Sequence, residues 1–526
     1  MNPSIDPRAG GPLDGPPVPQ RPTRPARHQT HYVRPPTPDP APPPPPPPGA
    51  TGPSRFAYDV TRYLCAAMHT DSGLARKTVA RIVDEPRRAA ASSPGLDLAC
   101  VLRHALAARR RQRRRDLVLS LLLIVLVVLI GVLVSFSSTY EILPGAYVLS
   151  LLLGCFAAWM TVTVEMFTTH YGVVSRQLKR ENFDPNRAPR PRNRGDAARI
   201  DAIELRDRGN VVMSSRFAPF IGHGDIYSTW SFALNTARPE KGRQITPFTI
   251  HDLNEHISAR VGALRLPGME VAEVLLMNGA DLLFGIDGRT RSEVLRNPAG
   301  PPGAHVSESL LRELREVDTA RARPYLAIRV TGWGGELVST LFLRCTLLPR
   351  REIAFIEGSN CLLSPVNEKY RAVDLILDSP TLRQWFSLFG LAALRTPILL
   401  IGAPFSLLGD LFAPFSMRRE QRRQARQIRL RTFNYGADFS LREAASSRLY
   451  YRYFQMLDRE LYAKTVEHRV LDSLVQFLED HNIDSSELIQ RQTTIYNSGL
   501  FAGRDISVTR SNIQAGAGRP QPVKSG

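Results

Sequence analysis

Two long uncharged apolar stretches, separated by a short polar segment, constrain this chain most. The first, Leu117–Phe136, reads LVLSLLLIVLVVLIGVLVSF, and the second, Leu143–Val164, carries no charge before Glu165. At about 1.5 Å per residue, each stretch is long enough as a helix to cross a hydrocarbon layer of about 30 Å. Only Ser137–Ile142 joins them, so the two helices must lie antiparallel and adjacent. The sequence predicts a transmembrane helical hairpin within residues 116–165.

Arginine runs flank the apolar stretches and predict their orientation. Six arginines within Arg109–Arg115 abut the first span, and seven more lie between Arg418 and Arg431. Cationic residues beside a span are retained on the cytoplasmic side, where anionic lipid attracts them. We therefore expect a multi-pass protein of the cell membrane with the lipid bilayer as a partner and both termini in the cytoplasm. The same location accounts for the net charge of +19, and no RNP-type or zinc-finger pattern supports nucleic-acid binding.

A third apolar stretch, Trp385–Phe415, is interrupted by Arg395, Pro397, Pro404 and Asp410. A straight lipid-exposed helix would carry both charges and would lose backbone hydrogen bonds at the prolines. A single crossing would also place the arginines that follow it outside the cell, against the positive-inside bias. We expect a re-entrant or interfacial helical hairpin at residues 381–416, with a third span as the alternative.

The segment between these apolar regions has the pattern of a cytoplasmic α+β domain, residues 196–380. Thr249–Val261 and Ser307–Val317 have helical periodicity, and the last three strands resemble a meander that turns at Trp333-Gly334-Gly335. The expected strands are Val211–Met213, Trp230–Leu234, Val271–Leu276, Tyr325–Val330, Val338–Leu347 and Ile353–Phe355.

Composition assigns the remaining segments. Proline-rich sequence with few aliphatic residues cannot bury enough surface to fold, so the N-terminal tail is expected to be disordered, with a stiff polyproline run at Pro42–Pro48. This disordered tail covers residues 1–54. The other expected segments are a helical cytoplasmic segment at 55–115, a basic linker at 166–195, arginine-rich and C-terminal helices at 417–495, and a flexible tail at 496–526.

The C-terminal helices begin with a capping-box pattern, Ser440-x-x-Glu443. Behind it, apolar residues keep a heptad-like register from Tyr450 through Leu457 and Leu461 to Leu478. The register fits either a coiled-coil seam, which would give a homo-oligomer or bind a protein partner, or a helix that packs on its own domain.

No sequence motif assigns a catalytic residue, a metal ligand or a cofactor. The five cysteines form no CxxC motif or zinc-type Cys/His spacing, which indicates a reducing interior without a disulfide framework. His251-Asp252-x-x-Glu255-His256 is the cluster most similar to a metal site. On a helix its two i, i+4 pairs point about 100° apart, so we expect a polar helix face.

A glycine-containing segment, Gly222-His223-Gly224-Asp225, is the other candidate for chemistry. It lacks the G-x-G-x-x-G spacing and the following helix that phosphate-binding loops have, so a plain turn is expected.

The chain resembles a group of uncharacterised actinobacterial multi-pass membrane proteins across residues 55–380. The segments that carry the resemblance are GLDLACVLRHALAARR, FAPFIGHGD, WSFAL, PFTIHDLNEHI and RPYLAIRVTGWGGELVSTLFLR. Separately, FLEDHNIDSSELIQRQTTIYNSGLFAGRDISV is similar to C-terminal tails of actinobacterial proteins with suspected defence or signalling roles. That tail pattern has a second asparagine in place of Ser498 and a glycine in place of Arg504.

These observations favour an anchored cytoplasmic scaffold or sensor. The alternatives are a membrane-tethered enzyme that uses the 222–256 region, and a pore or transporter subunit built from the apolar helices. A water-lined path needs polar positions that the first span does not have.

Overall fold

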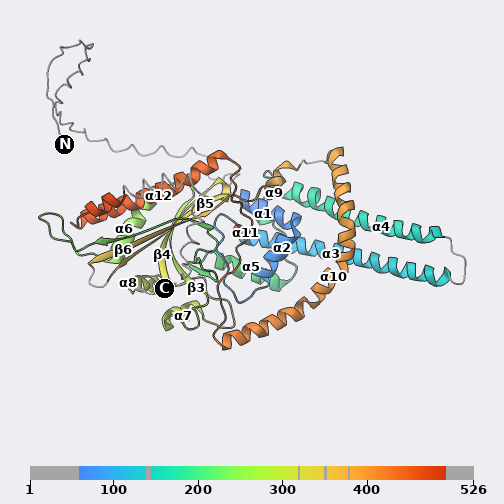
Figure 1. Cartoon of the computed structure of the whole chain (residues 1–526), viewed down its shortest axis with the longest axis horizontal. Helices are drawn as coiled ribbons and strands as arrows, with labels where there is room; N and C mark the ends of the chain where they lie inside the picture. The colour runs from blue at the N-terminus through green and yellow to red at the C-terminus, as the bar shows by residue number, and fades with distance from the viewer. Residues whose placement is uncertain (1–57, 138–143, 318–319, 349–351, 377–379, 493–526) are drawn as a thin grey trace, which may run out of the picture. The chain divides into compact units, whose positions relative to one another are not determined.

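The computed structural model describes residues 58–137, 144–317, 320–348, 352–376 and 380–492 (Figure 1). These residues lie in one compact unit, Pro53–Gly526. The expected N-terminal tail, its polyproline run and the flexible C-terminal tail lie outside the described residues.

The described chain contains long helices, short helices and one sheet. The helices are α1 (Asp59–Thr70), α2 (Ser72–Thr78), η1 (Val79–Val83), α3 (Leu98–Ser137), α4 (Pro144–Phe167), η2 (Thr168–Ser175), η3 (Pro185–Arg187), α5 (Arg194–Asp207), α6 (Ile250–Gly262), α7 (Gly288–Val294), α8 (Glu308–Glu316), η4 (Trp333–Gly335), α9 (Glu368–Arg371), η6 (Ala372–Leu375), α10 (Leu382–Arg429), α11 (Leu441–Ala444) and α12 (Tyr453–Asp480). The strands are β1 (Val211–Ser214), β2 (Asp225–Asn235), β3 (Met269–Asn278), β4 (Ala322–Gly332), β5 (Leu337–Leu347) and β6 (Ile353–Leu363).

Helices α3 and α4 form the expected hairpin, and their outer halves present apolar side chains to the surroundings. Leu121 is 62% exposed and Leu152 is 61% exposed, which in water would be an unusual concentration of apolar surface. In the described chain α3, α4 and α10 are long and apolar enough to cross a membrane. The N-terminal half of α3 packs against α1 in a buried core, so the helical segment predicted at residues 55–115 continues into the first apolar stretch without a break.

The expectation of a helical hairpin at residues 381–416 is wrong, because α10 is one continuous helix of 48 residues. It contains Pro397, Pro404 and Pro414 and continues through the arginine run to Arg429. Each proline removes one backbone donor and bends a helix without necessarily ending it. Packing of Ala392 and Ala403 against the hairpin supports the helix on both sides of its first proline.

Helix α10 crosses the base of the hairpin instead of running along it (Figure 1). Trp159 Nε1 of α4 donates to the backbone oxygen of Phe389 at 3.1 Å, and Ser406 Oγ donates to Asp116 of α3 at 2.7 Å. Phe389 and Ser406 are about 25 Å apart along the α10 axis. Their partners both lie near the end of the hairpin that joins the rest of the chain.

The six strands form one mixed sheet in the order β1-β3-β4-β5-β6-β2. Among the pairings of these six described strands, β1–β3 alone is parallel, and β4–β5–β6 form the predicted meander with Trp333 at the turn in a left-handed conformation. All six predicted strands lie within observed strands, which confirms the α+β character. The sequence did not predict helix α5. The predicted basic linker at 166–195 includes η2, a helix that continues α4.

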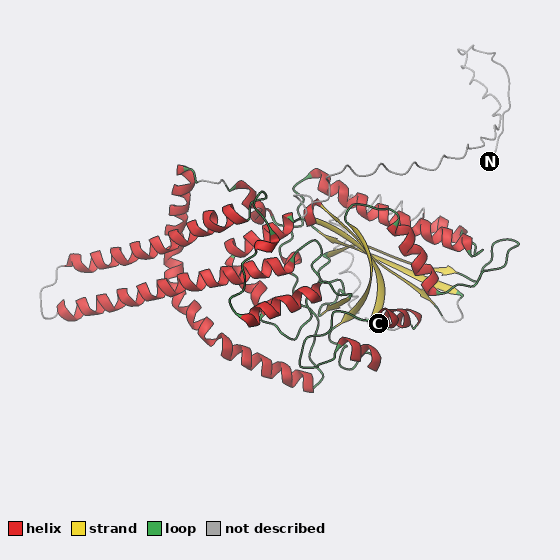
Figure 2. Cartoon of the chain, turned by 180° about the vertical axis from the view of Figure 1, so that it is seen from behind, coloured by secondary structure: helices red, strands yellow, loops and turns green. Residues whose placement is uncertain are grey.

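Helices cover one face of the sheet (Figure 2). On that face, Leu326, Leu343 and Ile356 pack with α6 and α12 in one buried cluster. On the opposite face, Ala327, Phe342 and Cys361 are covered mainly by loops. Segments before and after α10 therefore share the same core, since the strands precede this helix and α12 follows it.

Candidate functional site

A cavity of about 570 Å³ lies where α10 crosses the hairpin. Its wall comes from five parts of the chain: the α1–α2 junction, the inner end of α3, the α4–η2 junction, α9 and α10. The charged residues that line it are Asp71, Arg115, Glu165, Lys369 and Arg395.

Four of the five charged residues are paired with each other or with a neighbour. Lys369 Nζ lies 3.0 Å from Asp71, and Arg115 lies 3.7 Å from Glu165. Burial alone would raise the pKa of Asp71, but hydrogen bonds from its own helix and from Lys369 outweigh burial and lower it. Arg395 has no hydrogen bond or ion pair within the described chain. The cavity is therefore lined by one positively charged side chain, Arg395, that no described residue neutralises.

A second cavity, of about 400 Å³, adjoins the first and shares Ser72, Gln112 and Arg115 with it. Here Asp410 of α10 pairs with Arg113 and lies 3.9 Å from Arg109. The arginine run of α3 thus neutralises the acidic residue that interrupts the third apolar stretch. A charge in an apolar helix is expensive unless it is paired in this way.

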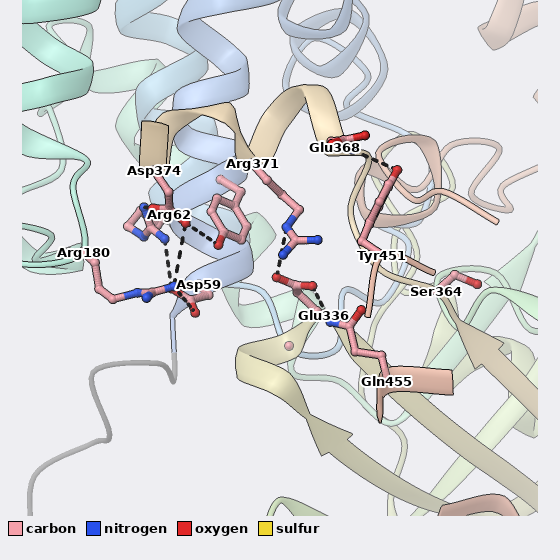
Figure 3. Close-up of polar contacts among 12 residues, drawn as sticks. Asp59, Arg62, Arg180, Glu336, Ser364, Glu368, Arg371, Asp374, Tyr451 and Gln455 are labelled. Atoms are coloured by element: carbon pink, nitrogen blue, oxygen red, sulfur yellow. Dashed lines mark hydrogen bonds and ion pairs between the residues drawn. The ribbon is translucent and has the colours of Figure 1, made fainter. Parts of the chain in front are cut away.

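The short segment α9–η6 lies between the last strand and α10, and it contacts both the cavity and the sheet. Lys369 and Tyr370 line the cavity. The next residue, Arg371, lies 3.6 Å from Glu336, which follows the β4–β5 turn and also accepts a hydrogen bond from Gln455 at 2.7 Å (Figure 3). A single turn of helix therefore joins the cavity wall to the sheet.

The same segment is held on its other side by α1. Asp374 pairs with Arg62 and accepts a hydrogen bond from Tyr63 at 2.7 Å (Figure 3). Arg62 is 1% exposed and also lies 3.0 Å from Asp59, which Arg180 contacts at 3.1 Å. Burial opposes ionisation of Asp374, but Arg62 and Tyr63 outweigh it and lower the pKa of this carboxyl. Removing one partner of a buried pair leaves a charge without compensation, so this network fixes the position of η6.

Comparison with known protein families matches residues 229–508 to the AbeC-like domain. This range makes up just over half of the chain. The chain belongs to the AbeC-like family. No curated protein and no solved structure matches it. The AbeC-like domain extends from within β2 to beyond α12, so it supplies α9, η6 and α10, whereas α1 and the hairpin lie outside it.

Within the AbeC-like domain, the His251 to His256 cluster is divided among separate partners. His251 Nε2 lies 3.1 Å from Glu316 of α8, and Asp252 forms a capping box with Thr249 at the start of α6. Hydrogen bonds from Thr249 lower the pKa of Asp252. His256 packs against the ring of Phe477. The four polar side chains of the motif do not converge on one point.

The Gly222 segment, which precedes the AbeC-like domain, binds a carboxylate of that domain. The backbone N–H groups of Gly222 and Gly224 donate to Glu443 at 2.6 and 3.3 Å, and Arg216 lies 3.3 Å from the same side chain. The Ser440 side chain accepts from the Glu443 backbone as the capping pattern predicts. The Glu443 side chain, however, occupies the donors that a phosphate would need.

Sequence analysis missed a cluster outside the AbeC-like domain. Cys65, Cys100 and His104 are buried with their ligand atoms within 4.8 Å of one another, and His69 contacts His104. The sequence signal was a Cys-x-x-x-His spacing that occurs once in α1 and once in α3.

Proposed function

We propose that this AbeC-like protein is a membrane-anchored sensor of an anionic, phosphate-bearing ligand at the cytoplasmic surface of the cell membrane. The α3–α4 hairpin anchors it, the cavity beneath the hairpin binds the anion, and α9–η6 transmits occupancy to the sheet. The bilayer is its partner through the apolar helices.

The packing around α10 supports an anchor of two spans with both termini in the cytoplasm. Phe439 and Leu441, which follow α10, share a buried core with Val366 and Tyr370, which precede it. A single crossing would place these groups on opposite sides of the membrane. An interfacial α10, lying across the hairpin, satisfies both the packing and the positive-inside bias.

The charge of the cavity supports an anionic ligand. Arg395 lines the cavity without a partner in the described chain, and Lys369 and Arg115 also line it. Guanidinium groups form charge-assisted hydrogen bonds with phosphate, often in pairs. At the base of a hairpin, such a cavity lies at the depth of lipid head groups.

The position of α9 carries the proposal of a sensor. Lys369 and Tyr370 face the cavity, while Arg371, the next residue, holds the Glu336 carboxylate beside the β4–β5 turn. A ligand that competes for Lys369 weakens its pairing with Asp71 and displaces a segment that is tied to the sheet. The enzyme alternative has less support, because the Gly222 donors and the His251 cluster are already engaged by other residues.

Hydrogen exchange of the full chain in lipid nanodiscs tests this function. Anionic phosphatidylglycerol, but not zwitterionic phosphatidylcholine, should change exchange at the Trp333–Leu337 turn. Arg395→Gln should require about tenfold more anionic lipid, the loss expected for one charge-assisted hydrogen bond. Arg312→Gln, on the exposed side of α8, is the matched control and should respond like the wild type.

The hydrogen-exchange experiment has two further outcomes that decide between ligands and test the sensor. A response to inorganic phosphate in neutral nanodiscs would identify a soluble anion as the ligand. Equal exchange at the turn in all lipids, with and without phosphate, would contradict the sensor.

A further inference from the structure

Two cysteines and two histidines meet in the interface between α1 and the inner half of α3. Cys65 Sγ lies 3.6 Å from Cys100 Sγ, and His69 Nε2 lies 3.0 Å from His104 Nδ1. All four residues are buried, from 0% exposed for Cys65 to 7% for His69. Polar and nucleophilic side chains rarely gather in an apolar core without a shared partner.

The spacing explains how four such groups reach one place. Cys65 and His69 are four residues apart on α1, and Cys100 and His104 are four residues apart on α3, so each pair shares one helix face. The helices pack with cysteine against cysteine and histidine against histidine. Each helix therefore contributes one sulfur and one imidazole, and each group lies beside the group of the same kind on the other helix.

We propose that Cys65, His69, Cys100 and His104 bind one Zn²⁺ ion in a Cys₂His₂ site. A tetrahedral zinc with Zn–S bonds of about 2.3 Å separates its two sulfurs by about 3.8 Å, and Zn–N bonds of about 2.0 Å separate two nitrogens by about 3.3 Å. The observed separations of 3.6 and 3.0 Å fall a few tenths of an ångström short of these values. The ligand atoms of Cys65, Cys100 and His104 already lie within 4.8 Å of one another, and His69, which contacts His104, would complete the site by rotation of its side chain.

The charge balance of this site suits an apolar core. Two thiols lose their protons to solvent as two Zn–S bonds form, and two neutral imidazoles supply the other bonds, so the complete unit carries no net charge.

The location of the proposed zinc site gives the ion a path of entry and links the site to the rest of the fold. His69 lines the cavity beneath the hairpin, from which an ion reaches the cluster. Bound zinc would fasten α1 to α3 one helical turn or more before the arginine run. Arg62, which holds η6, lies on the same helix as Cys65 and His69.

Elemental analysis of the full-length protein, purified in detergent with a reducing agent, tests the site. The wild type should contain about one zinc per chain. Cys65→Ser combined with Cys100→Ser should lose the metal, whereas the matched control Cys345→Ser combined with Cys361→Ser, also at buried cysteines, should retain it.

A measurement on the unmodified chain covers the case in which the double variant does not fold. Cobalt exchanged into the wild type should give the visible absorption of tetrahedral Co²⁺ and near-ultraviolet thiolate charge-transfer bands. Metal-free wild-type protein that also gives no such spectrum with cobalt would overturn the proposal. So would a Cys65–Cys100 disulfide in protein isolated under thiol-blocking conditions.

Discussion

His223 is a fully buried histidine on the loop side of the sheet, where its ring packs edge-on against Phe342 and its Nδ1 lies 3.4 Å from Thr340. Burial, with a smaller effect from Arg329, lowers the pKa of His223 from 6.5 to about 3. Between these values the unfolded chain binds a proton that the folded chain does not, so the free energy of unfolding falls as the pH falls.

His223→Gln should therefore reduce the pH dependence of stability. The slope approaches about 1.4 kcal/mol per pH unit as the unfolded histidine becomes protonated, so between pH 6.5 and pH 5 the wild type should lose about 1.6 kcal/mol more than the variant. Denaturant midpoints at the two pH values provide the measurement. An equal loss in both proteins would show that this histidine titrates normally in the folded state.

At the residue scale, the sequence identified polar motifs but not their partners. Glu443 was recognised through its helix-capping position, yet its side chain binds Gly222 and Gly224, more than two hundred residues earlier. The Cys65 and Cys100 spacings were visible, but their meaning depends on the packing of α1 against α3. Local pattern shows which groups share a helix face, and only tertiary structure shows which faces meet.

At the scale of elements, α12 combines both interpretations of its heptad-like pattern. Leu471, Leu474 and Leu478 are buried against the sheet, which confirms packing on its own domain for this half. In the other half, Phe454 is 67% exposed and Leu461 is 57% exposed. This exposed half leaves self-association as a prediction.

Leu457→Asp combined with Leu461→Asp should abolish self-association of the full chain in detergent. Two charges in a seam that buries two leucines weaken a dimer by about a hundredfold or more. Light scattering coupled to size-exclusion chromatography measures the mass, and Arg312→Asp on α8 controls for added charge. A monomeric wild type at micromolar concentration would refute the dimer.

Elements with strong periodicity were predictable, and those shaped by their surroundings were not. Runs of strand-forming residues and the turn at Trp333-Gly334-Gly335 located the meander of β4, β5 and β6. The 48-residue helix α10 was expected to break at its prolines and charges. It is continuous because Asp410 forms an ion pair with Arg113, and because α3 and α4 pack against the helix from the side.

At the scale of the whole molecule, the position of α10 decides where the proposed ligand site lies. If this helix is interfacial, its cavity residue Arg395, the neighbouring Lys369 of α9 and the rest of the AbeC-like domain face the same aqueous phase. The strands and α12 share one core although α10 separates them in sequence. This connectivity favours an even number of crossings, which the sequence alone had favoured only through its arginines.

Reporter fusions at the two termini of the full chain test this central claim most directly. A cytoplasmic reporter and a reporter active only after export, each placed at the N-terminus and at the C-terminus, distinguish two spans from three. We predict cytoplasmic activity at both ends, since we propose that the hairpin crosses the membrane twice and that α10 does not cross it. An exported C-terminal reporter with a cytoplasmic N-terminal reporter would require α10 to span the membrane, and would contradict the sensor site at the cytoplasmic surface.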